Sequence, residues 1–440
     1  MEEWQLRDAK AVWHPYTQMK TGGNPSVVVS ASGAWLQLSD GRKILDAIGS
    51  WWVNLHGHTH PKLVAAIQQQ VAQLEQVIFA GFTHTPAIQL AEKILQHLPW
   101  QAKVFYSDNG STAVEVAIKM AIQYWHNKGE IKPKLLAFQH AYHGDTFGAM
   151  AVSGRSAFTL PYADNLFETT YLPDPIPQNR KEIEEMIIRV GEEGKTAAFI
   201  YEPLVMGAGG MICYAPEELE YILTLTKKYH LLLIADEVMT GFGRTGTLFA
   251  SDQVALKPDL MCLSKGLTGG FLPLGITTAN AEIFQAFWSD DRMKTLFHGH
   301  SFTANPMACA VGVASLDLLE DPEYFQNISR ISKQHQAVIS RFQKYPWVKE
   351  VRSCGVIFAI TLEDGGKDSQ YLSWVGPYIY QWFLDKNILL RPLGNVLYLL
   401  PPYCITDAEL EWVYQTIETF LIDWDNIQTK EPIHPGAIYG

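Results

Sequence analysis

Short apolar runs alternate with amphipathic segments from about residue 100 onward. The runs are apolar at nearly every position, which is typical of strands covered on both faces by helices. Between them, segment 111–126 repeats apolar residues at three- and four-residue spacing, as one face of a helix does. We expect strands at 104–107, 135–139, 197–202, 231–236, 260–264 and 275–278. This alternation predicts an α/β domain built around a buried, mostly parallel sheet.

The pattern changes near residue 322, where longer helical stretches and shorter strand patterns begin. The elements expected there are a helix at 323–345, short strands within 351–362 and at 396–400, and a final helix at 407–422. Such a mixture is how an α+β domain reads. Two strand patterns near the N-terminus, at 27–29 and 34–38, are expected to pack beside this C-terminal part.

Three segments are therefore predicted. Residues 1–50 form an N-terminal segment that packs with the small domain, 51–321 form the large domain, and 322–440 form the small C-terminal domain. Two helices of the large domain are expected to begin where proline follows a capping residue, at Thr85-Pro86 and Asn305-Pro306.

Composition is that of a globular protein, with 47% hydrophobic and 18% charged residues among 440. The net charge of −12 argues against a nucleic-acid surface or an anionic membrane as a partner. The first residues, MEEWQLRDAK, lack the basic-then-apolar pattern of a signal peptide, and no apolar stretch is long enough to span a membrane. The five cysteines are widely spaced, which favours reduced thiols. A cytoplasmic protein is expected.

An aspartate and a lysine each end an apolar run. Asp236 closes the run 231–236, and Lys265 follows the run 260–264. Side chains that follow neighbouring parallel strands meet at the same edge of a sheet. An amine and a carboxylate there are the groups that pyridoxal 5'-phosphate needs: the amine forms a Schiff base with its aldehyde, and the carboxylate keeps its pyridine nitrogen protonated. Burial and nearby cations would lower the pKa of Lys265.

Further candidates follow the neighbouring strands. Gly110 and Ser111 open a predicted helix, whose free backbone amides suit a phosphate, although an ordinary strand-to-helix turn reads the same way. Tyr142 follows the next strand and could stack on a flat cofactor. Val238, two residues after Asp236, would point the same way on an extended strand and could meet the opposite ring face.

Three motifs suggest other chemistry. Residues 241–246, GFGRTG, match the glycine spacing of a dinucleotide loop, but neither an amphipathic helix nor an acid-ended second strand follows. The histidines of 56–60 alternate with Gly and Thr before a proline, which favours a turn, and no carboxylate or cysteine is expected nearby to complete a metal site. Residues 298–301, HGHS, precede a helix start and are interpreted as an anion contact. A nicotinamide-dependent oxidoreductase is therefore a weaker alternative.

Over nearly its whole length the chain resembles the class III pyridoxal-phosphate aminotransferases of fold type I. The resemblance rests on LLIADEVMTGFGRTG, PDLMCLSKGLTGG and HGHSFTANPMACA. It implies a large, mostly parallel-sheet domain, a smaller α+β domain formed by the N- and C-terminal segments, and a homodimer with shared active sites.

The resemblance also implies a role for each matching position. Lys265, Asp236 and Tyr142 are the expected catalytic residues. The cofactor would be held by Gly110, Ser111, Tyr142, Glu202, Asp236, Val238, Lys265 and, from the other subunit, His300 and Ser301. The substrates would be bound by Tyr16, Trp51, Tyr142, Lys265, Gly299 and Arg391. No metal is expected.

Four shorter segments narrow the expectation: WHPYT, SWW, AYHGDTFGAM and RPLGNVLYLLPPY. They are similar to the members of the class that act in biotin synthesis, with S-adenosylmethionine as amino donor and 8-amino-7-oxononanoate as acceptor. Tyr16 would stack on the adenine ring, and Arg391 would bind the acceptor carboxylate. Lysine as donor, another ω-amino acid transaminase and a PLP-binding protein without enzymatic activity remain alternatives.

Overall fold

The computed structural model describes residues 3–364, 371, 373 and 375–424. The end of the predicted C-terminal domain, 425–440, lies outside the described residues. The chain divides into two compact units: 61–325 form the larger, and 1–60 with 326–440 form the smaller. The predicted domain limits after residues 50 and 321 stay a prediction.

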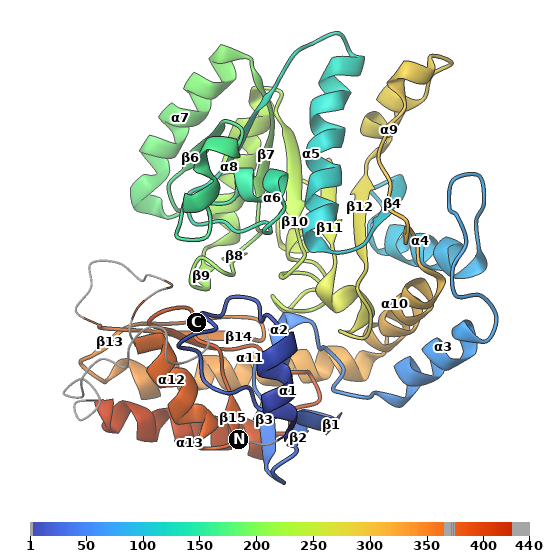
Figure 1. Ribbon diagram of the computed structural model, residues 1–440. Coiled ribbons are helices and arrows are strands. Elements are labelled where there is room, and N and C mark those ends of the chain that lie inside the picture. The colour runs from blue at the N-terminus through green and yellow to red at the C-terminus, as the bar shows by residue number, and fades with distance from the viewer. Residues whose placement is uncertain (1–2, 365–370, 372, 374, 425–440) are drawn as a thin grey trace. The chain divides into compact units, whose positions relative to one another are not determined.

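A seven-stranded sheet forms the centre of the larger unit, in the order β4-β12-β11-β10-β7-β5-β6 (Figure 1). Its strands are β4 (Lys103–Ser107), β5 (Lys134–Phe138), β6 (Thr169–Leu172), β7 (Thr196–Tyr201), β10 (Leu232–Asp236), β11 (Leu260–Leu263) and β12 (Gly275–Ala279). Strand β12 runs antiparallel to both of its neighbours, and the pairs among β5, β6, β7, β10 and β11 are parallel. All six predicted strands are confirmed to within two residues at each end. Strand β6, whose residues 169–172 are only partly buried at three positions, was not predicted.

Eight α-helices of the larger unit surround or extend this sheet among the described residues. They are α3 (Pro61–Val71), α4 (Thr85–His97), α5 (Gly110–Asn127), α6 (Phe147–Val152), α7 (Arg180–Glu193), α8 (Pro216–Lys228), α9 (Ala281–Phe287) and α10 (Pro306–Leu319). A short hairpin, β8 (Val205–Met206) with β9 (Ile212–Cys213), follows β7.

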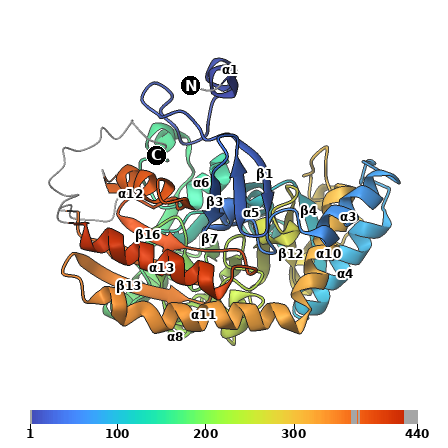
Figure 2. The same ribbon diagram turned by 90° about the horizontal axis from the view of Figure 1, so that it is seen from below.

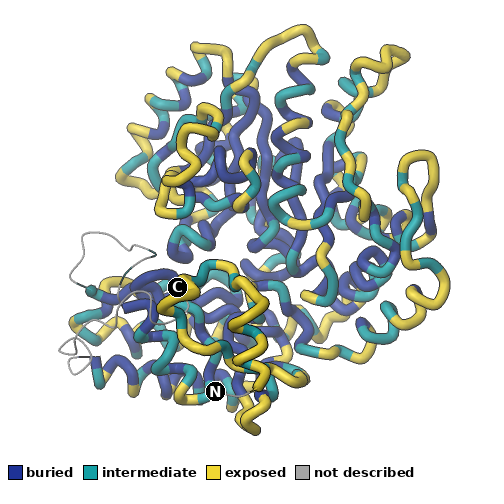
Figure 3. Tube along the Cα trace, in the orientation of Figure 1, coloured by how far each residue is buried: buried dark blue, intermediate teal, exposed yellow. Residues whose placement is uncertain are grey.

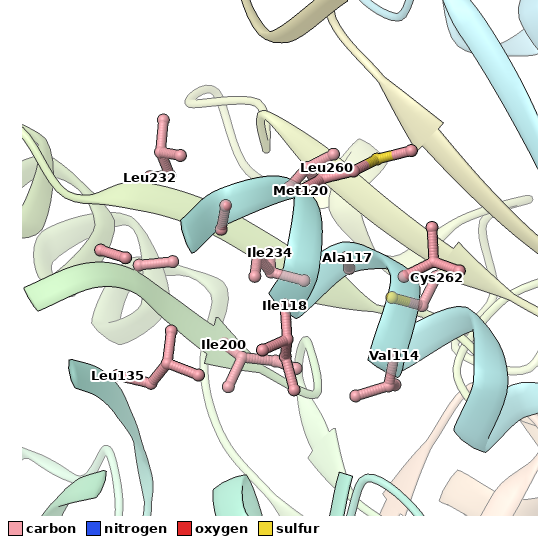
Figure 4. Packing of buried hydrophobic residues seen from close by; sticks show 14 of the residues in the cluster. Val114, Ala117, Ile118, Met120, Leu135, Ile200, Leu232, Ile234, Leu260 and Cys262 are labelled. Carbon is pink, nitrogen blue, oxygen red and sulfur yellow. The ribbon is translucent and has the colours of Figure 1, made fainter. Parts of the chain in front are cut away.

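Helix α5 lies directly on the sheet and confirms the predicted helix at 111–126. Its residues Val114, Ala117 and Ala121 are fully buried, and they pack with Ile234 of β10 and Ile200 of β7 in one cluster (Figure 4). Each fully buried Val or Ile side chain of this cluster contributes about 1.5–3 kcal/mol to folding. Figure 3 shows the strands as the most buried part of this unit. The sheet therefore gives rigid strand ends on which a site can be built.

The two predicted helix starts had different outcomes. Asn305 caps α10 as expected, because its side chain accepts a hydrogen bond from the backbone N–H of Ala308 at 3.1 Å. The predicted cap Thr85 is wrong: His84 holds that position, and its Nδ1 accepts from the N–H of Ala87 at 3.2 Å. The ring is fixed from its other side, where Nε2 contacts the carbonyl of Ala304 at 2.7 Å. A tertiary contact thus lets a histidine act as the cap.

Residues from both ends of the chain form the smaller unit. Its N-terminal elements are α1 (Glu3–Ala11), β1 (Val28–Ser32), β2 (Trp35–Leu38), β3 (Lys43–Asp46) and α2 (Gly49–Trp52). Its C-terminal elements are most of α11 (Pro322–Gln343), β13 (Val348–Cys354), β14 (Ile357–Leu362), α12 (Val375–Leu384), β15 (Ile388–Leu389), β16 (Val396–Leu399) and α13 (Asp407–Ile422). The expected packing of the two ends is confirmed, because β15 joins the N-terminal sheet as a parallel neighbour of β3.

Helices α11 and α13 lie side by side in this unit (Figure 2). The guanidinium of Arg341 binds the carboxylate of Glu418 at 2.7 Å, and His335 Nδ1 lies 2.7 Å from the hydroxyl of Tyr414 in the buried contact. The predicted final helix at 407–422 is confirmed at both ends. None of the helices in the described part of the chain is long and apolar enough to cross a membrane.

Candidate active site

Asp236 and Lys265 follow adjacent parallel strands, as predicted. Asp236 is the last residue of β10 and is paired with Cys262 of β11, and Lys265 opens a 3-10 turn just after β11 ends at Leu263. The carboxyl ends of parallel strands share one edge of the sheet. The sheet itself therefore brings the amine and the carboxylate to the same place.

The environment of Lys265 makes its amine easier to deprotonate than that of an ordinary lysine. Its pKa falls to about 8, first because burial removes water from the ammonium, with the positive charge of Arg244 adding a smaller effect. The negative charges of Asp236 and Glu202 oppose this shift but do not cancel it. Lys265 also has a φ of 45°, in the left-handed region that side chains rarely adopt. A lysine in this state is a competent base and nucleophile near neutral pH.

Asp236 has a partner that the sequence did not reveal. The side chain is only 4% exposed, and its Oδ2 lies 2.7 Å from Nδ1 of His143, whose ring N–H can donate to this oxygen. Its Oδ1 accepts from the backbone N–H of Val238 at 3.0 Å. His143 is buried, and no described residue offers a hydrogen bond to its Nε2. The only sequence signal for His143 was its place next to Tyr142.

Glu202 is a second buried carboxylate near Lys265, and it holds the backbone of Tyr142. It follows β7 directly, is buried, and accepts hydrogen bonds from the backbone N–H groups of Tyr142 at 2.9 Å and Gly207 at 3.0 Å. The pKa of Glu202 is raised to about 7, chiefly by burial and to a smaller extent by the negative charge of Asp236, against the lowering effects of His143 and of the two backbone hydrogen bonds. Glu202 thus fixes the backbone that carries Tyr142.

The start of α5 is narrow and rich in backbone donors. Asn109 caps the helix: its side chain accepts from Thr112 N at 3.0 Å, and the Thr112 hydroxyl accepts from Asn109 N at 3.0 Å. Gly110 and Ser111 lie in the first turn, where backbone N–H groups have no acceptor within the helix. These amides and the positive end of the helix dipole suit a phosphate.

Two glycines make room at this helix start. A Cβ on Gly110 would lie 2.7 Å from Cγ1 of Val238, and a Cβ on Gly144 would lie 2.0 Å from the hydroxyl of Ser111. Gly144 also has a φ of 133°, which other residues avoid. Val238 is therefore close to the predicted phosphate loop. The reasoning from an extended strand was wrong, however, because β10 ends at Asp236 and Val238 lies in the following turn.

The 298–301 loop lies beside Asp108 of the same chain. Nδ1 of His300 is 3.5 Å from the carboxylate of Asp108, and Nε2 of His300 is 3.1 Å from Nε2 of His298. Gly299 has open space around it, and the carbonyl of Ser301 accepts from the side chain of Gln76 at 3.0 Å. The roles of this loop as a phosphate and substrate contact stay predictions.

Tyr16, Trp51 and Arg391 come together in the smaller unit, although they are far apart in the sequence. The guanidinium carbon of Arg391 lies 4.6 Å from the centre of the Trp51 ring. The Tyr16 ring meets Trp51 edge-on with 5.5 Å between ring centres, and the Tyr371 ring is 6.4 Å from Tyr16. Trp51 is 39% exposed, so the cluster has an open aromatic face. Aromatic rings and an arginine fork form a surface for a flat ring or a carboxylate.

The remaining motifs fit the structure in different ways. After β10 the next element is the 3-10 turn at Ala250–Gln253, so the described chain begins no α-helix at 246. Among the described residues no group of three His, Cys, Asp or Glu side chains could hold a metal ion. The expectation that no carboxylate lies near the histidines of 56–60 was wrong, because Asp46 contacts Nε2 of His58 at 2.9 Å.

Comparison with known proteins decides the family. A family profile described as aminotransferase class-III matches residues 17–421. The chain belongs to the class-III aminotransferase family. It is 48% identical over 421 residues to the adenosylmethionine-8-amino-7-oxononanoate aminotransferase of Synechococcus elongatus, a match that covers 93% of this chain and 98% of that protein. The enzyme of the same name from Geobacter sulfurreducens is 38% identical, with 95% and 96% covered.

Solved structures agree with this assignment. The crystal structure of adenosylmethionine-8-amino-7-oxononanoate aminotransferase from Methanocaldococcus jannaschii matches with a TM-score of 0.91 at 33% identity, covering 96% of this chain and 98% of that chain. An amine transaminase from an uncultivated Pseudomonas species, solved in its PLP-bound form, matches with a TM-score of 0.86 at 30% identity, covering 94% and 98%. The predicted fold class and enzyme class are confirmed.

Proposed function

We propose that this aminotransferase uses pyridoxal 5'-phosphate to transfer an amino group from S-adenosylmethionine to 8-amino-7-oxononanoate, giving 7,8-diaminononanoate for biotin synthesis. The observation that carries the chemistry is the Lys265 amine, with a pKa near 8, beside the Asp236 carboxylate. The relatives named for this reaction, at up to 48% identity over most of the chain, support the choice of substrates.

The residues of the larger unit fit this cofactor. Asp236, oriented by His143, is the partner for a protonated pyridine nitrogen, and the unpaired Nε2 of His143 marks a polar site with unused capacity. Gly110 and Ser111 would offer their amides to the phosphate, Tyr142 and Val238 would contact the ring, and Glu202 holds the backbone of Tyr142 in place. When bound, the cofactor supplies an electron sink for the amino-transfer chemistry.

Lys265 is the residue that moves the proton at the reacting carbon. Its Nζ can give and take a proton near neutral pH, because general acid–base catalysis works best when the pKa lies close to the working pH. The Asp236 carboxylate is held in one orientation, since it accepts hydrogen bonds from both His143 and Val238. Tyr142 is assigned contact with both the ring and the substrate.

Arg391 is assigned the carboxylate of the acceptor. A planar guanidinium can bind a carboxylate through two parallel hydrogen bonds, and that of Arg391 lies over the Trp51 ring. Tyr16, edge-on to Trp51, is assigned the adenine ring of the donor. Gly299, with free space around it, is assigned a substrate contact, and His300 with Ser301 are assigned the cofactor phosphate of the partner subunit.

The proposal includes a homodimer in the cytoplasm. The assigned role of His300 and Ser301 needs a second copy of the chain, and most oligomers of this kind are symmetric dimers. The five cysteines are thiols, as expected for a reducing compartment. Measuring the mass of the purified protein in solution tests the dimer.

The decisive experiment supplies the purified, cofactor-loaded enzyme with 8-amino-7-oxononanoate and one donor at a time. We expect diaminononanoate with S-adenosylmethionine, detected by mass spectrometry, together with the donor's amino-depleted product. Product with lysine alone would reassign the donor. Activity on pyruvate or 2-oxoglutarate, and none on 8-amino-7-oxononanoate, would instead favour the kind of reaction carried out by the ω-transaminase of Pseudomonas jessenii, a structural neighbour at 26% identity and a TM-score of 0.90.

A further inference from the structure

Asp46 is a fully buried carboxylate with no place in the roles assigned above. It ends strand β3 and accepts four hydrogen bonds from the chain that follows. Its Oδ1 accepts from Ile48 N at 3.2 Å, and its Oδ2 accepts from Ser50 N at 2.7 Å and Ser50 Oγ at 2.9 Å. The fourth donor is Nε2 of His58, also 2.9 Å from Oδ2. A buried carboxylate with this many donors is held in one orientation.

The segment that Asp46 binds has an unusual backbone. Gly49, Ser50 and Trp52 have φ values of 57°, 60° and 65°, and ψ of Ser50 is −94°. Non-glycine residues in such regions cost of order 1–3 kcal/mol each and persist only where surrounding contacts hold them. Two of the four bonds to Asp46 come from Ser50 itself, and Trp52 is held on the other side by its Nε1–H bond to the Tyr398 hydroxyl at 2.9 Å. Trp51 lies between these two anchors.

The same aspartate lies next to the strand that leads to Arg391. Asp46 is paired with Leu389 across the β3–β15 ladder, and the N–H of Ala47 donates to the Leu389 carbonyl at 3.3 Å. Arg391 follows Leu389 by two residues, and Trp51 follows Asp46 by one short turn. Trp51 and Arg391, whose guanidinium carbon lies 4.6 Å from the Trp51 ring centre, thus both follow segments that meet at the buried Asp46.

We propose that Asp46, with His58 as its hydrogen-bond donor, is a positioning residue that sets the specificity of the enzyme for an acceptor with a terminal carboxylate. Asp46 itself touches neither substrate nor cofactor in this scheme. It fixes the turn that places the Trp51 ring, and the ring fixes the plane of the Arg391 guanidinium. This inference rests on the proposed function, because it concerns the acceptor that Arg391 binds.

Geometry explains why a buried residue can control specificity here. A guanidinium recognises a carboxylate through the N–H groups at its edge, in the plane of the fork, and an aromatic ring contacts it through its face. Such a contact depends on the plane of the fork, and a displacement of about 1 Å in a positioning contact can cost on the order of a hundredfold in rate. Releasing the Ser50 turn would let the Trp51 ring turn and would leave Arg391 charged but poorly oriented.

The test compares 8-amino-7-oxononanoate with its methyl ester, which keeps the reacting ketone and amine but lacks the carboxylate charge. The wild-type enzyme should prefer the acid strongly. In Asp46→Ala we expect the ratio of kcat/KM for acid over ester to fall about 10- to 100-fold, mostly through a higher KM for the acid. In Asp46→Asn the ratio should fall less. The amide oxygen can still accept hydrogen bonds, but the NH2 group would face donors where the second carboxylate oxygen accepted them.

His58 gives a second, milder pair of variants. His58→Gln keeps a side-chain N–H and should retain most of the acid preference, whereas His58→Leu should lose part of it. Asp40→Asn is the matched control, because Asp40 is an exposed carboxylate of the same unit whose hydrogen bonds go to Arg42. That control should keep the wild-type ratio.

A merely structural role for Asp46 predicts a different result. If the variants only unfold a fraction of the protein, kcat falls for acid and ester alike and the ratio stays unchanged, which would refute the proposal. Calorimetric titration gives a readout apart from turnover: the Kd of the acid should rise in Asp46→Asn, and that of the ester should not. If the wild-type enzyme does not use 8-amino-7-oxononanoate at all, the proposed function has failed, whereas an active wild type with an unchanged ratio in the variants refutes only the role of Asp46.

Discussion

The Lys265–Asp236 cluster and the Trp51–Arg391 cluster are built in opposite ways. The first lies at the ends of two adjacent parallel strands, with Asp236 only 4% exposed and bonded to a buried histidine. In the second, the Trp51 side chain is 39% exposed and the Arg391 guanidinium lies over its ring. Trp51 lies in a turn in which three residues have positive φ values. The ends of regular strands position the buried amine and carboxylate, and an irregular turn positions the tryptophan of the second cluster.

The two clusters differ because amine chemistry and substrate recognition need different surroundings. A buried amine and carboxylate need low water content to shift the pKa of the amine, and a sheet covered by helices supplies it. Recognition of the acceptor carboxylate needs an accessible aromatic ring and a defined plane of the guanidinium. A turn stabilised by one buried carboxylate can hold such a ring in place. Changes in the first cluster should therefore stop turnover, and changes in the second should change which substrate is used.

The largest expected effect is in Lys265→Ala. Removing the amine should lower kcat at least about a thousandfold, because both the nucleophile and the proton carrier are lost. Turnover of S-adenosylmethionine with 8-amino-7-oxononanoate, followed by mass spectrometry, measures it. Lys181→Ala is the control, since that side chain is 89% exposed and should leave the rate unchanged. Retained turnover in Lys265→Ala would remove the lysine from the mechanism.

Arg391→Ala should affect the acceptor more than the chemistry. Loss of charge-assisted, two-bonded contact is expected to lower kcat/KM for the acid about 10- to 100-fold. The methyl ester should be affected much less, so the acid and ester rates would become similar. Arg42→Ala, which removes an exposed partner of Asp40, is the control. An equal loss for acid and ester would mean that Arg391 does not bind the carboxylate.

His143→Leu tests whether the hydrogen bond from His143 to the Asp236 carboxylate contributes to catalysis. The variant removes the 2.7 Å bond to Oδ2 and should lower kcat about tenfold, with a shifted pH–rate profile and little change in either KM. His143→Asn, which can still donate to the carboxylate, should recover part of the rate. The control is His140→Asn in the same loop, where the ring contacts Asp174 at a half-exposed position. An unchanged pH profile in His143→Leu would leave this residue a packing role only.

Glu202→Gln should change the pH dependence of stability. The pKa of Glu202 is raised from 4.5 to about 7 in the fold, so between those values the unfolded chain loses a proton that the folded protein keeps. The free energy of unfolding therefore falls as pH rises from about 4.5 to 7, by up to roughly 3 kcal/mol for this group. Glutamine stays neutral at every pH, so the variant should lose the part of the pH-dependent decrease in unfolding free energy that Glu202 causes.

Thermal unfolding of the cofactor-free protein at pH 5 to 7.5 measures this change. A weaker pH dependence is expected in Glu202→Gln, and some should remain because burial also raises the pKa of Glu237 to about 7. Glu185→Gln on the exposed face of α7 should behave like the wild type. A Glu202→Gln protein with the full wild-type pH dependence would show that Glu202 is ionised in the fold.

Much of the larger unit could be predicted because its strands are continuously apolar. Runs such as 231–236 and 260–264 are buried on both faces, so the sequence alone marked β10, β11 and the two residues that follow them. Strand β6 lies at the edge of the sheet and is only partly buried, so it gave no such signal. The antiparallel direction of β12 was also invisible, because strand direction leaves no trace in an apolar pattern.

The groups expected to carry the chemistry can be read from the sequence: an amine and a carboxylate after neighbouring buried strands, a glycine-containing helix start, and the motifs of the family. The partners of those groups became visible in the fold. It put His143 on Asp236, His84 at the cap of α4, and Asp46 under the turn that carries Trp51. Strand burial is a local, periodic property that a sequence displays. A hydrogen bond between residues far apart in the chain depends on the fold that brings them together, so it can be identified only in the structure.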